Sequence, residues 1–346
     1  MADVSRDART LNLARALEQE GLRVATIGIS AQDATSRAIA RWWKFNSRIA
    51  SLDVRPRLVV AMDLFALSAA QAVAKKHSIP LLYDMREFYF ALGPLAGKGI
   101  KQKILVAHER RLVGHVDDVI VSGELDADIV QQRFALKKRP VVLLNTPPYK
   151  DPVLSPLRYS LAIPQTTTLA LYQGVVHHGR GLAHFLRALP QMPDVHLVVI
   201  GDGPAQGTLM ALARDLAVDA RVSWLGSVPY DELHQLTCGA DIGLCLIEPI
   251  SMSYEYALPN KLFEYMMARI PSLVSDLPAL HAHVISHPVG VLVERSLSPT
   301  SIVAAMDRAM QVKTRAEMRS ACEDIRELAY ERQASTACGL IREHLT

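Results

Sequence analysis

The chain has 346 residues, of which 50% are apolar, and its formal net charge is only +3. This length exceeds what one compact core supports, so we expect two domains. The charge gives no electrostatic reason to expect nucleic acid as the main ligand, and no apolar run is long enough to span a bilayer. Charged residues near the start interrupt any signal-peptide core, and the four cysteines lack zinc-ligand spacing. We therefore expect a cytoplasmic protein with free thiols.

The first half alternates helical and strand patterns. We expect helices at 5–20, 34–50, 98–115 and 124–134, and strands at 23–29, 58–62, 80–83, 119–122 and 140–144. Asp3 or Ser5 is placed to cap the first helix, and Asp63 to cap the helix that follows the second strand. Such alternation predicts a doubly wound parallel sheet.

A proline-rich break separates the halves. The residues from Asn145 to Thr168 include Pro147, Pro148, Pro152, Pro156 and Pro164. This density excludes a long regular element and marks a linker. The second half then repeats the alternation, with strands expected at 169–173, 195–200, 222–225, 242–247, 272–275 and 290–293 and helices from Ser298 onward.

The stretch from Ser251 to Met267 carries the clearest functional pattern. It follows the buried strand expected at 242–247. Its second half has a helical pattern of apolar residues, and Pro259 lies where that helix should begin. Ligands of parallel sheets sit at the carboxyl ends of strands, where helix N-termini offer N–H groups to phosphate. Lys261 adds a cation, and Glu264 lies where its carboxylate could accept hydrogen bonds from ribose hydroxyls. The alternative is an ordinary crossover helix with a charged surface.

Several short motifs occur in an order that resembles one enzyme family. They are Tyr172-Gln173-Gly174, Gly179-Arg180-Gly181-Leu182, Ile200-Gly201-Asp202-Gly203-Pro204, Trp224-Leu225-Gly226, Ala240-Asp241-Ile242-Gly243 and 258–266. Together they resemble the donor domain of family 4 glycosyltransferases, which have the GT-B fold. More loosely, 63–67, 79–84, Glu109-Arg110 and Asn145-Thr146-Pro147 resemble the acceptor domain of that family.

The resemblance implies an α/β protein with two Rossmann-like doubly wound domains that face each other across a cleft. We expect the acceptor-side domain over 1–146, the linker over 147–167 and the donor domain over 168–328. A final helix over 329–346 could pack back on the first domain. The implied reaction transfers a sugar, with retention of anomeric configuration, from a UDP- or GDP-linked donor to a glycan or lipid-linked acceptor. The resemblance implies no cofactor and no metal.

The candidate site residues follow from the motifs. The leaving nucleoside diphosphate gains negative charge, so catalysis needs cations and N–H donors aimed at its oxygens. Arg180 places a guanidinium on a tight loop beyond a strand, a group that suits phosphate. We assign catalytic roles to Arg180, Lys261 and Glu255. Donor binding is assigned to Gly174, Gly179, Gly203, Val228, Asn260, Lys261, Leu262 and Glu264, and the acceptor-side candidates are Asp84, Arg86 and Glu87.

Three positions depart from the pattern of the family. Tyr256 stands where many members have a glutamate, so either Glu255 serves instead or another sugar contact is used. Val175 replaces a common arginine, and Arg86 stands where relatives often have a histidine. We also expect the first domain to lack its initial central strand, because a helical pattern begins almost at Met1.

Two further questions stay open in the sequence. The basic, aromatic segment 36–48 is either a crossover helix whose tryptophans pack on the sheet or a peripheral contact with the inner face of a membrane. The function has two alternatives, a GT-B nucleotide-sugar epimerase and a non-catalytic nucleotide-sugar-binding relative.

Overall fold

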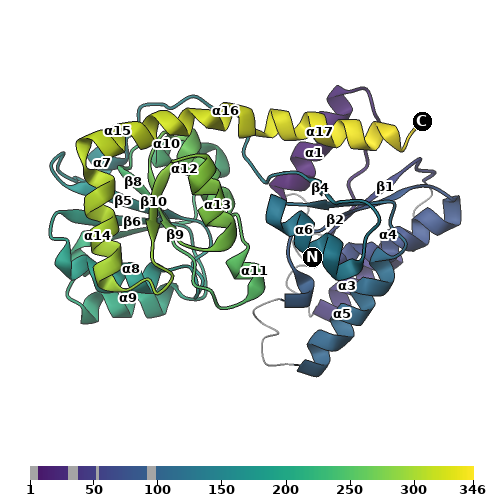
Figure 1. Cartoon of the computed structure of the whole chain (residues 1–346), viewed down its shortest axis with the longest axis horizontal. Helices are drawn as coiled ribbons and strands as arrows, with labels where there is room; N and C mark the ends of the chain where they lie inside the picture. The colour runs from purple at the N-terminus through teal and green to yellow at the C-terminus, as the bar shows by residue number, and fades with distance from the viewer. Residues whose placement is uncertain (1–6, 30–37, 52–53, 92–98) are drawn as a thin grey trace. The chain divides into compact units, whose positions relative to one another are not determined.

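The computed structural model describes residues 7–29, 38–51, 54–91 and 99–346. These residues form two compact units, of which one combines Met1–Asn145 with Tyr330–Thr346 and the other is Thr146–Ala329. Each unit contains its own parallel sheet flanked by helices (Figure 1). The chain is therefore an α/β protein with two Rossmann-like domains, as the alternating pattern predicts.

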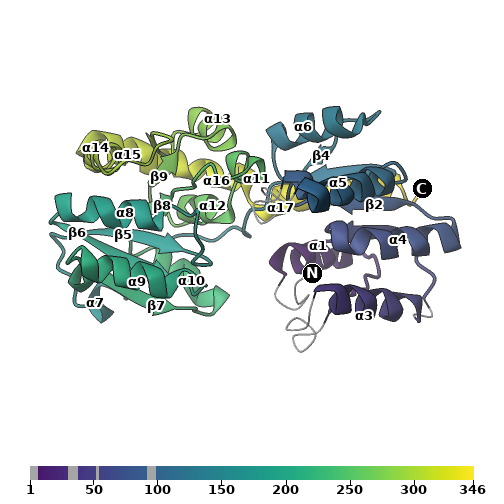
Figure 2. The ribbon, with the colours of Figure 1, turned by 90° about the horizontal axis from the view of Figure 1, so that it is seen from below.

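The sheet of the first unit has four parallel strands in the order β1-β2-β3-β4. They are β1 (Val59–Met62), β2 (Leu81–Asp84), β3 (Asp118–Val121) and β4 (Val141–Val142). The helices of this unit are α1 (Ala8–Gln19), α3 (Ala38–Ala50), α4 (Leu64–His77), α5 (Gly99–Val113), α6 (Glu124–Phe134) and α17 (Tyr330–Glu343). Helix α4 lies on one face of the sheet with α3 beyond it, and α6 lies on the opposite face (Figure 2).

The prediction of a strand at 23–29 is wrong. Within this segment the structure has only an isolated bridge residue, Ile29, and β1 pairs with β2 alone among the described residues. The apolar side chains are buried in another way: Ile27 and Ile29 pack with Phe45 and Ala69, which come from α3 and α4. Alternating hydrophobicity thus reports burial here, and helices cover the apolar side chains without the segment forming a strand of the sheet.

The predicted helix caps also need correction. Asp3 and Ser5 lie outside the described residues, and the observed cap of α1 is Asp7, whose side chain accepts from the Thr10 amide. Asp63 does precede α4, but its side chain makes no capping hydrogen bond. Its backbone has φ 85°, a region that residues other than glycine rarely occupy.

The sheet of the second unit has six parallel strands in the order β10-β9-β8-β5-β6-β7. They are β5 (Thr168–Gln173), β6 (Val195–Ile200), β7 (Val222–Gly226), β8 (Ile242–Cys245), β9 (Ser272–Ser275) and β10 (Gly290–Val293). Along the chain the order runs outward from β5 to β7 and then returns to β8 beside β5. A doubly wound sheet has its topological switch point at such a reversal.

Helices complete the second unit. They are α7 (Leu157–Ser160), α8 (Leu182–Ala188), α9 (Gln206–Asp215), α10 (Tyr230–Thr237), α11 (Met252–Glu255), α12 (Asn260–Met267), α13 (Pro278–Ser286), α14 (Pro299–Met310), α15 (Val312–Ala321) and α16 (Ile325–Leu328). Buried residues of α8, α9 and α14 form one core with the sheet. The proline-rich segment holds only the single turn α7, and Arg158 of this turn pairs with Asp241.

No described helix has the length and apolar character needed to cross a bilayer. The four cysteines are unpaired, as expected.

Candidate active site

The candidate donor residues gather at the carboxyl edge of the six-stranded sheet. The loop after β5 runs through Gly174 to Gly181, and the loop after β8 leads through α11 to Pro259. Because β5 and β8 are neighbours, these two loops meet at the switch point. This is the place where doubly wound sheets bind their ligands.

Backbone hydrogen bonds join the loops of three strands. The Val176 amide donates to the Asp202 carbonyl (2.9 Å), and the Glu248 amide donates to the Gly179 carbonyl (3.0 Å). Gly203 allows the close approach, because a Cβ atom there would collide with the carbonyl of Val176. The edge is therefore a fixed backbone frame for the side chains above it.

Helix α12 is fixed against both central strands. The Tyr265 hydroxyl, which is fully buried, donates to the carbonyl of Leu171 on β5 (3.1 Å) and accepts from the Gln173 amide (3.3 Å). Pro259 occupies the N-cap position of α12. The Leu262 amide donates to the Pro259 carbonyl (3.1 Å), so that N–H group is not free for a phosphate, contrary to our expectation. Lys261 thus stands on the first turn of an anchored helix, and Glu264 lies one turn further on.

Lys261 is a buried cation. Its side chain passes beside Gly174, and its Nζ lies 3.6 Å from the ring centroid of Tyr172. Burial lowers the pKa of Lys261 to about 7, and the charge of nearby Arg180 acts in the same direction. Binding an anion would reverse this cost, since a negative partner favours the charged ammonium.

Glu264 is oriented by a chain of two hydrogen bonds. Gln173 Nε2 donates to Glu264 Oε2 (2.5 Å), and the Thr237 hydroxyl donates to Gln173 Oε1 (2.8 Å). Burial raises the pKa of Glu264, while the hydrogen bond from Gln173 opposes that shift. The carboxylate is held in one orientation, and no described residue donates a hydrogen bond to its Oε1.

Arg180 lies on the loop between β5 and α8. Its guanidinium carbon is 4.6 Å from the ring centroid of Tyr254, which comes from α11. Gly179 makes room for that ring, because an added Cβ would come within 3.0 Å of a Tyr254 ring carbon and 2.7 Å of Ile250. Arg180 is close enough to Lys261 for its charge to lower the pKa of the lysine. The structure therefore brings Arg180 close to Lys261 and Glu264 of α12, although it lies far from them in sequence.

The remaining donor candidates lie around this cluster. Glu255 follows Tyr254 on α11 and forms an ion pair with Arg295, which follows β10. Val228 lies just beyond β7, where the Ser227 amide donates to the Asp202 carboxylate (2.9 Å). Asn260 is the first residue of α12 and is exposed.

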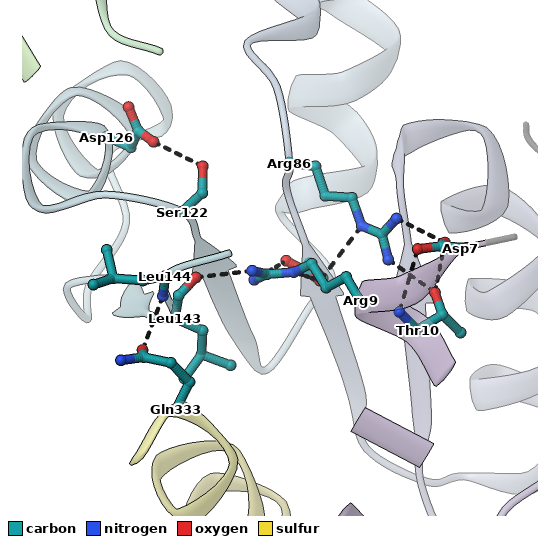
Figure 3. A network of polar contacts seen from close by, with 10 residues as sticks. Asp7, Arg9, Thr10, Arg86, Ser122, Asp126, Leu143, Leu144 and Gln333 are labelled. Carbon is teal, nitrogen blue, oxygen red and sulfur yellow. Dashed lines mark hydrogen bonds and ion pairs between the residues drawn. The ribbon is translucent and has the colours of Figure 1, made fainter. Parts of the chain in front are cut away.

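The acceptor-side candidates have structural partners in the first unit. Asp84 is almost completely buried, and Arg9 donates to both of its carboxylate oxygens (2.7 and 2.9 Å) and to the Leu143 carbonyl (2.9 Å). Arg86 donates to the side chains of Asp7 (2.7 Å) and Thr10 (2.8 Å), as Figure 3 shows. This network holds α1 against the carboxyl ends of β2 and β4. Glu87 lies three residues beyond the end of β2 and has interactions of its own.

Sequence reasoning missed the aromatic and amide partners of the cluster. Tyr172 and Gln173 were present only as parts of a family motif, and Tyr254 lies six residues before the helix that carries Lys261. In the first unit it missed the buried, unpartnered Oδ1 of Asp63, a residue whose pKa burial raises to about 6. Within the described ranges, no group of three histidine, cysteine, aspartate or glutamate side chains is arranged to hold a metal ion.

Comparison with known proteins identifies the family of both parts of the chain. Residues 156–330 match the family model of the group 1 glycosyl transferases, and residues 4–147 match that of the glycosyl transferase 4-like domain. No curated protein matches the chain significantly.

Solved structures share the fold at low sequence identity. Sucrose-phosphate synthase from Thermosynechococcus elongatus aligns over 97% of this chain and 92% of its own, with a TM-score of 0.75 and 16% identity. Anabaena HepE in complex with UDP-glucose aligns over 97% and 88%, with a TM-score of 0.71 and 15% identity. WaaG, described as a glycosyltransferase involved in lipopolysaccharide biosynthesis, aligns over 99% and 97%, with a TM-score of 0.70 and 14% identity.

These structures are glycosyltransferases of the GT-B fold, and the two family models together span both units of the chain. The chain therefore belongs to the group 1 glycosyl transferases and is a glycosyl-transferring enzyme.

Proposed function

We propose that this enzyme transfers a sugar, with retention of anomeric configuration, from a UDP- or GDP-linked donor to a glycan or lipid-linked acceptor. A role in cell-surface polysaccharide or glycoconjugate synthesis follows from such an acceptor. The observation that carries the proposal is the meeting of Arg180, Lys261 and Glu264 at the switch point of the second unit. The complexes of HepE with UDP-glucose and with UDP lend support, since that protein shares the fold.

The three side chains divide the work of holding the donor. Arg180 and Lys261 meet the diphosphate, whose negative charge grows as the glycosidic bond breaks. Glu264 accepts from the ribose hydroxyls through the carboxylate oxygen that Gln173 leaves free. Because two cations supply the positive charge, the reaction needs no metal ion in this proposal.

Retention of the anomeric configuration follows if the donor itself supplies the base. A donor phosphate oxygen takes the proton of the acceptor hydroxyl while the bond from the anomeric carbon to the diphosphate breaks. The acceptor oxygen then bonds to the anomeric carbon on the face that the leaving group has left. Glu255, which Arg295 holds in an ion pair, contacts the donor sugar rather than attacking it.

Peripheral contact with an anionic membrane is part of the proposal for the first unit. On α3 the residues Trp43 (66% exposed) and Arg48 are exposed, whereas Phe45 packs inward. On α5 the exposed residues Ile100 and Ile104 flank Lys101 and Lys103, which are also exposed. Basic faces that also present large apolar side chains suit an anionic lipid surface. Flotation with phosphatidylserine vesicles tests this, with neutral phosphatidylcholine vesicles as the control.

The donor assignment has a direct test. We expect UDP or GDP to raise the thermal unfolding midpoint of the wild type. Arg180→Ala or Lys261→Ala should weaken nucleotide binding by about tenfold or more, because a charged hydrogen bond contributes roughly 1.5–3 kcal/mol. The exposed Arg187→Ala on α8 is the matched control. Unchanged affinity of Arg180→Ala in calorimetry would contradict its role.

Product analysis tests the reaction itself. Incubation with a UDP- or GDP-sugar should release free sugar slowly without an acceptor, and NMR of a transferred product should show the anomeric configuration of the donor. Inversion at C2 of the sugar would indicate an epimerase, and binding without turnover would indicate a non-catalytic relative. Loss of activity in excess EDTA, restored by manganese, would contradict a metal-independent reaction.

A further inference from the structure

Aromatic rings, and not carboxylates, hold both cations of the candidate donor site. Lys261 Nζ lies 3.6 Å from the ring centroid of Tyr172, and the guanidinium carbon of Arg180 lies 4.6 Å from that of Tyr254. Both distances are within the range of cation–π interactions. Elsewhere in the second unit the arginines Arg158 and Arg315 pair with the carboxylate of Asp241. Within the described part of the chain, Arg180 and Lys261 have no such carboxylate partner.

The carboxylates of the same loops are occupied by other groups. Glu248 accepts from the Gly181 amide (3.3 Å) and lies 3.8 Å from His184 Nε2. Glu255 forms its ion pair with Arg295, and Glu264 accepts from Gln173. Among the described residues none of these three carboxylates forms an ion pair with Arg180 or Lys261, although the charge of Glu264 favours the charged form of Lys261 from a greater distance.

The two rings are themselves held in place. The Tyr172 hydroxyl donates to the Val175 carbonyl (2.8 Å), and its ring is buried in the main core of the unit. The Tyr254 amide donates to the carbonyl of Ser251 (2.9 Å), which caps α11, and the ring lies beside Gly179. A fixed ring restrains the cation that lies on it.

A ring face and a carboxylate have different consequences for an anion site. A carboxylate partner would cancel the charge and would have to be displaced before a phosphate could bind. The face of a tyrosine ring attracts a cation through its quadrupole and leaves the net charge intact. A cation on a ring is therefore both positioned and still attractive to an anion.

We propose that Tyr172 and Tyr254 are positioning residues that hold Lys261 and Arg180 for the donor diphosphate without neutralising them. The proposal rests on the donor site of the proposed function. It predicts that the rings contribute to the binding of phosphate and not to the binding of the nucleoside. The informative quantity is therefore the ratio of the dissociation constants of uridine and UDP.

The test compares Tyr254→Leu, which removes the ring, with Tyr254→Phe, which keeps it. We expect UDP affinity to fall roughly three- to thirtyfold in Tyr254→Leu, the range that cation–π energies imply. Uridine affinity should not change, and Tyr254→Phe should bind both ligands like the wild type. Tyr159→Leu, which alters an exposed tyrosine of α7, is the matched control.

Each other outcome overturns the inference. An unchanged ratio in Tyr254→Leu would mean that the ring does not position Arg180, and equal losses of uridine and UDP would mean that it contacts the nucleoside. A loss in Tyr254→Phe as large as in Tyr254→Leu would assign the effect to the hydroxyl. If the wild type binds neither UDP nor GDP, the proposed donor site is wrong. If the wild type binds UDP and Tyr254→Leu binds it equally well, only the role of the ring is wrong. The same comparison of Tyr172→Leu with Tyr172→Phe tests the ring beside Lys261. It is informative where the two variants have the same thermal unfolding midpoint.

Discussion

At the scale of single residues, the environment of Glu264 supports the ribose contact that we propose for it. Gln173 fixes one carboxylate oxygen, and the other can accept from adjacent hydroxyls that a deoxyribose lacks. We expect Glu264→Gln to keep the fold but to weaken UDP binding by about tenfold or more. It should also reduce the preference for UDP over 2′-deoxy-UDP. Calorimetry with both nucleotides measures this, with Glu317→Gln on exposed α15 as the control. Retention of the full preference for UDP would refute the ribose assignment.

The lowered pKa of Lys261 leads us to expect that nucleotide binding depends on pH. Burial lowers its pKa to about 7, although Cys245 and Glu264 act in the opposite direction. A bound diphosphate would raise the pKa again, because a negative partner favours the charged ammonium. Well below pH 7 the lysine is charged with or without ligand, so there it makes no contribution to the pH dependence of affinity. As pH rises above 7, the empty site loses its proton and must regain it on binding, so affinity should fall by up to about tenfold per unit.

This pH dependence can be measured between pH 7 and 9, where a terminal phosphate with a pKa of about 6 no longer titrates. Titration calorimetry near pH 8 in buffers of different ionisation enthalpy should show proton uptake. Lys261→Met should bind UDP more weakly and without the slope. A slope that persists in Lys261→Met would show that another group is responsible.

At the scale of elements, α5 contains a buried acid whose ionisation opposes folding. Glu109 is completely buried, its Oε1 accepts from the Tyr83 hydroxyl (3.2 Å) and its Oε2 has no partner. Burial raises its pKa to about 7, while Tyr83 and Arg133 act in the opposite direction. Between pH 4.5 and 7 the folded state therefore holds a proton that the unfolded state has lost. The contribution of this group to stability is present below about pH 4.5 and is lost as pH rises through 7.

We expect Glu109→Gln to stabilise the first unit at pH 8 by up to about 3 kcal/mol and to have little effect at pH 4.5. The amide keeps the hydrogen bond to Tyr83 without a buried charge. Thermal unfolding identifies the transition of this unit as the one that UDP does not shift. Glu18→Gln on the exposed face of α1 is the control. Equal destabilisation at both pH values would mean that packing, and not ionisation, dominates at this position.

The elements also show what the sequence can predict. Helix α6 and the burial of β8 follow directly from local periodicity, and the Gly-rich turns locate the carboxyl ends of β5 and β6. The segment 23–29 could not be assigned correctly, because Ile27 and Ile29 are buried against α3 and α4 without the segment forming a strand. The Arg9–Asp84 pair joins residues 75 positions apart, and no local pattern encodes it. The pairing of Arg180 with Tyr254 likewise depends on the path of the loop after β8.

At the scale of the whole molecule, the end of the chain belongs to the unit that contains its beginning. Helix α17 packs on α1, and Ala337, Leu340 and Ile341 share a core with Leu13 and Leu17. Two polar contacts add to this packing: the Leu144 amide donates to Gln333 (2.9 Å), and His344 lies 2.7 Å from the Asp118 carboxylate. The stability of the first unit therefore depends on a helix that follows the second unit in sequence.

Removal of residues 330–346 should consequently affect one unit and spare the other. We expect the truncated chain to lose the thermal transition that UDP does not shift, because the apolar face of α1 and the ends of β2 and β4 become exposed. The UDP-dependent transition should persist, since its site lies wholly within Thr146–Ala329. Ile341→Ala in the full chain should destabilise the first unit by about 2–5 kcal/mol, the usual cost of emptying such a buried site. The exposed Ser335→Ala on the same helix should change neither transition. Loss of the UDP-dependent transition on truncation would show instead that the second unit needs α17 to fold.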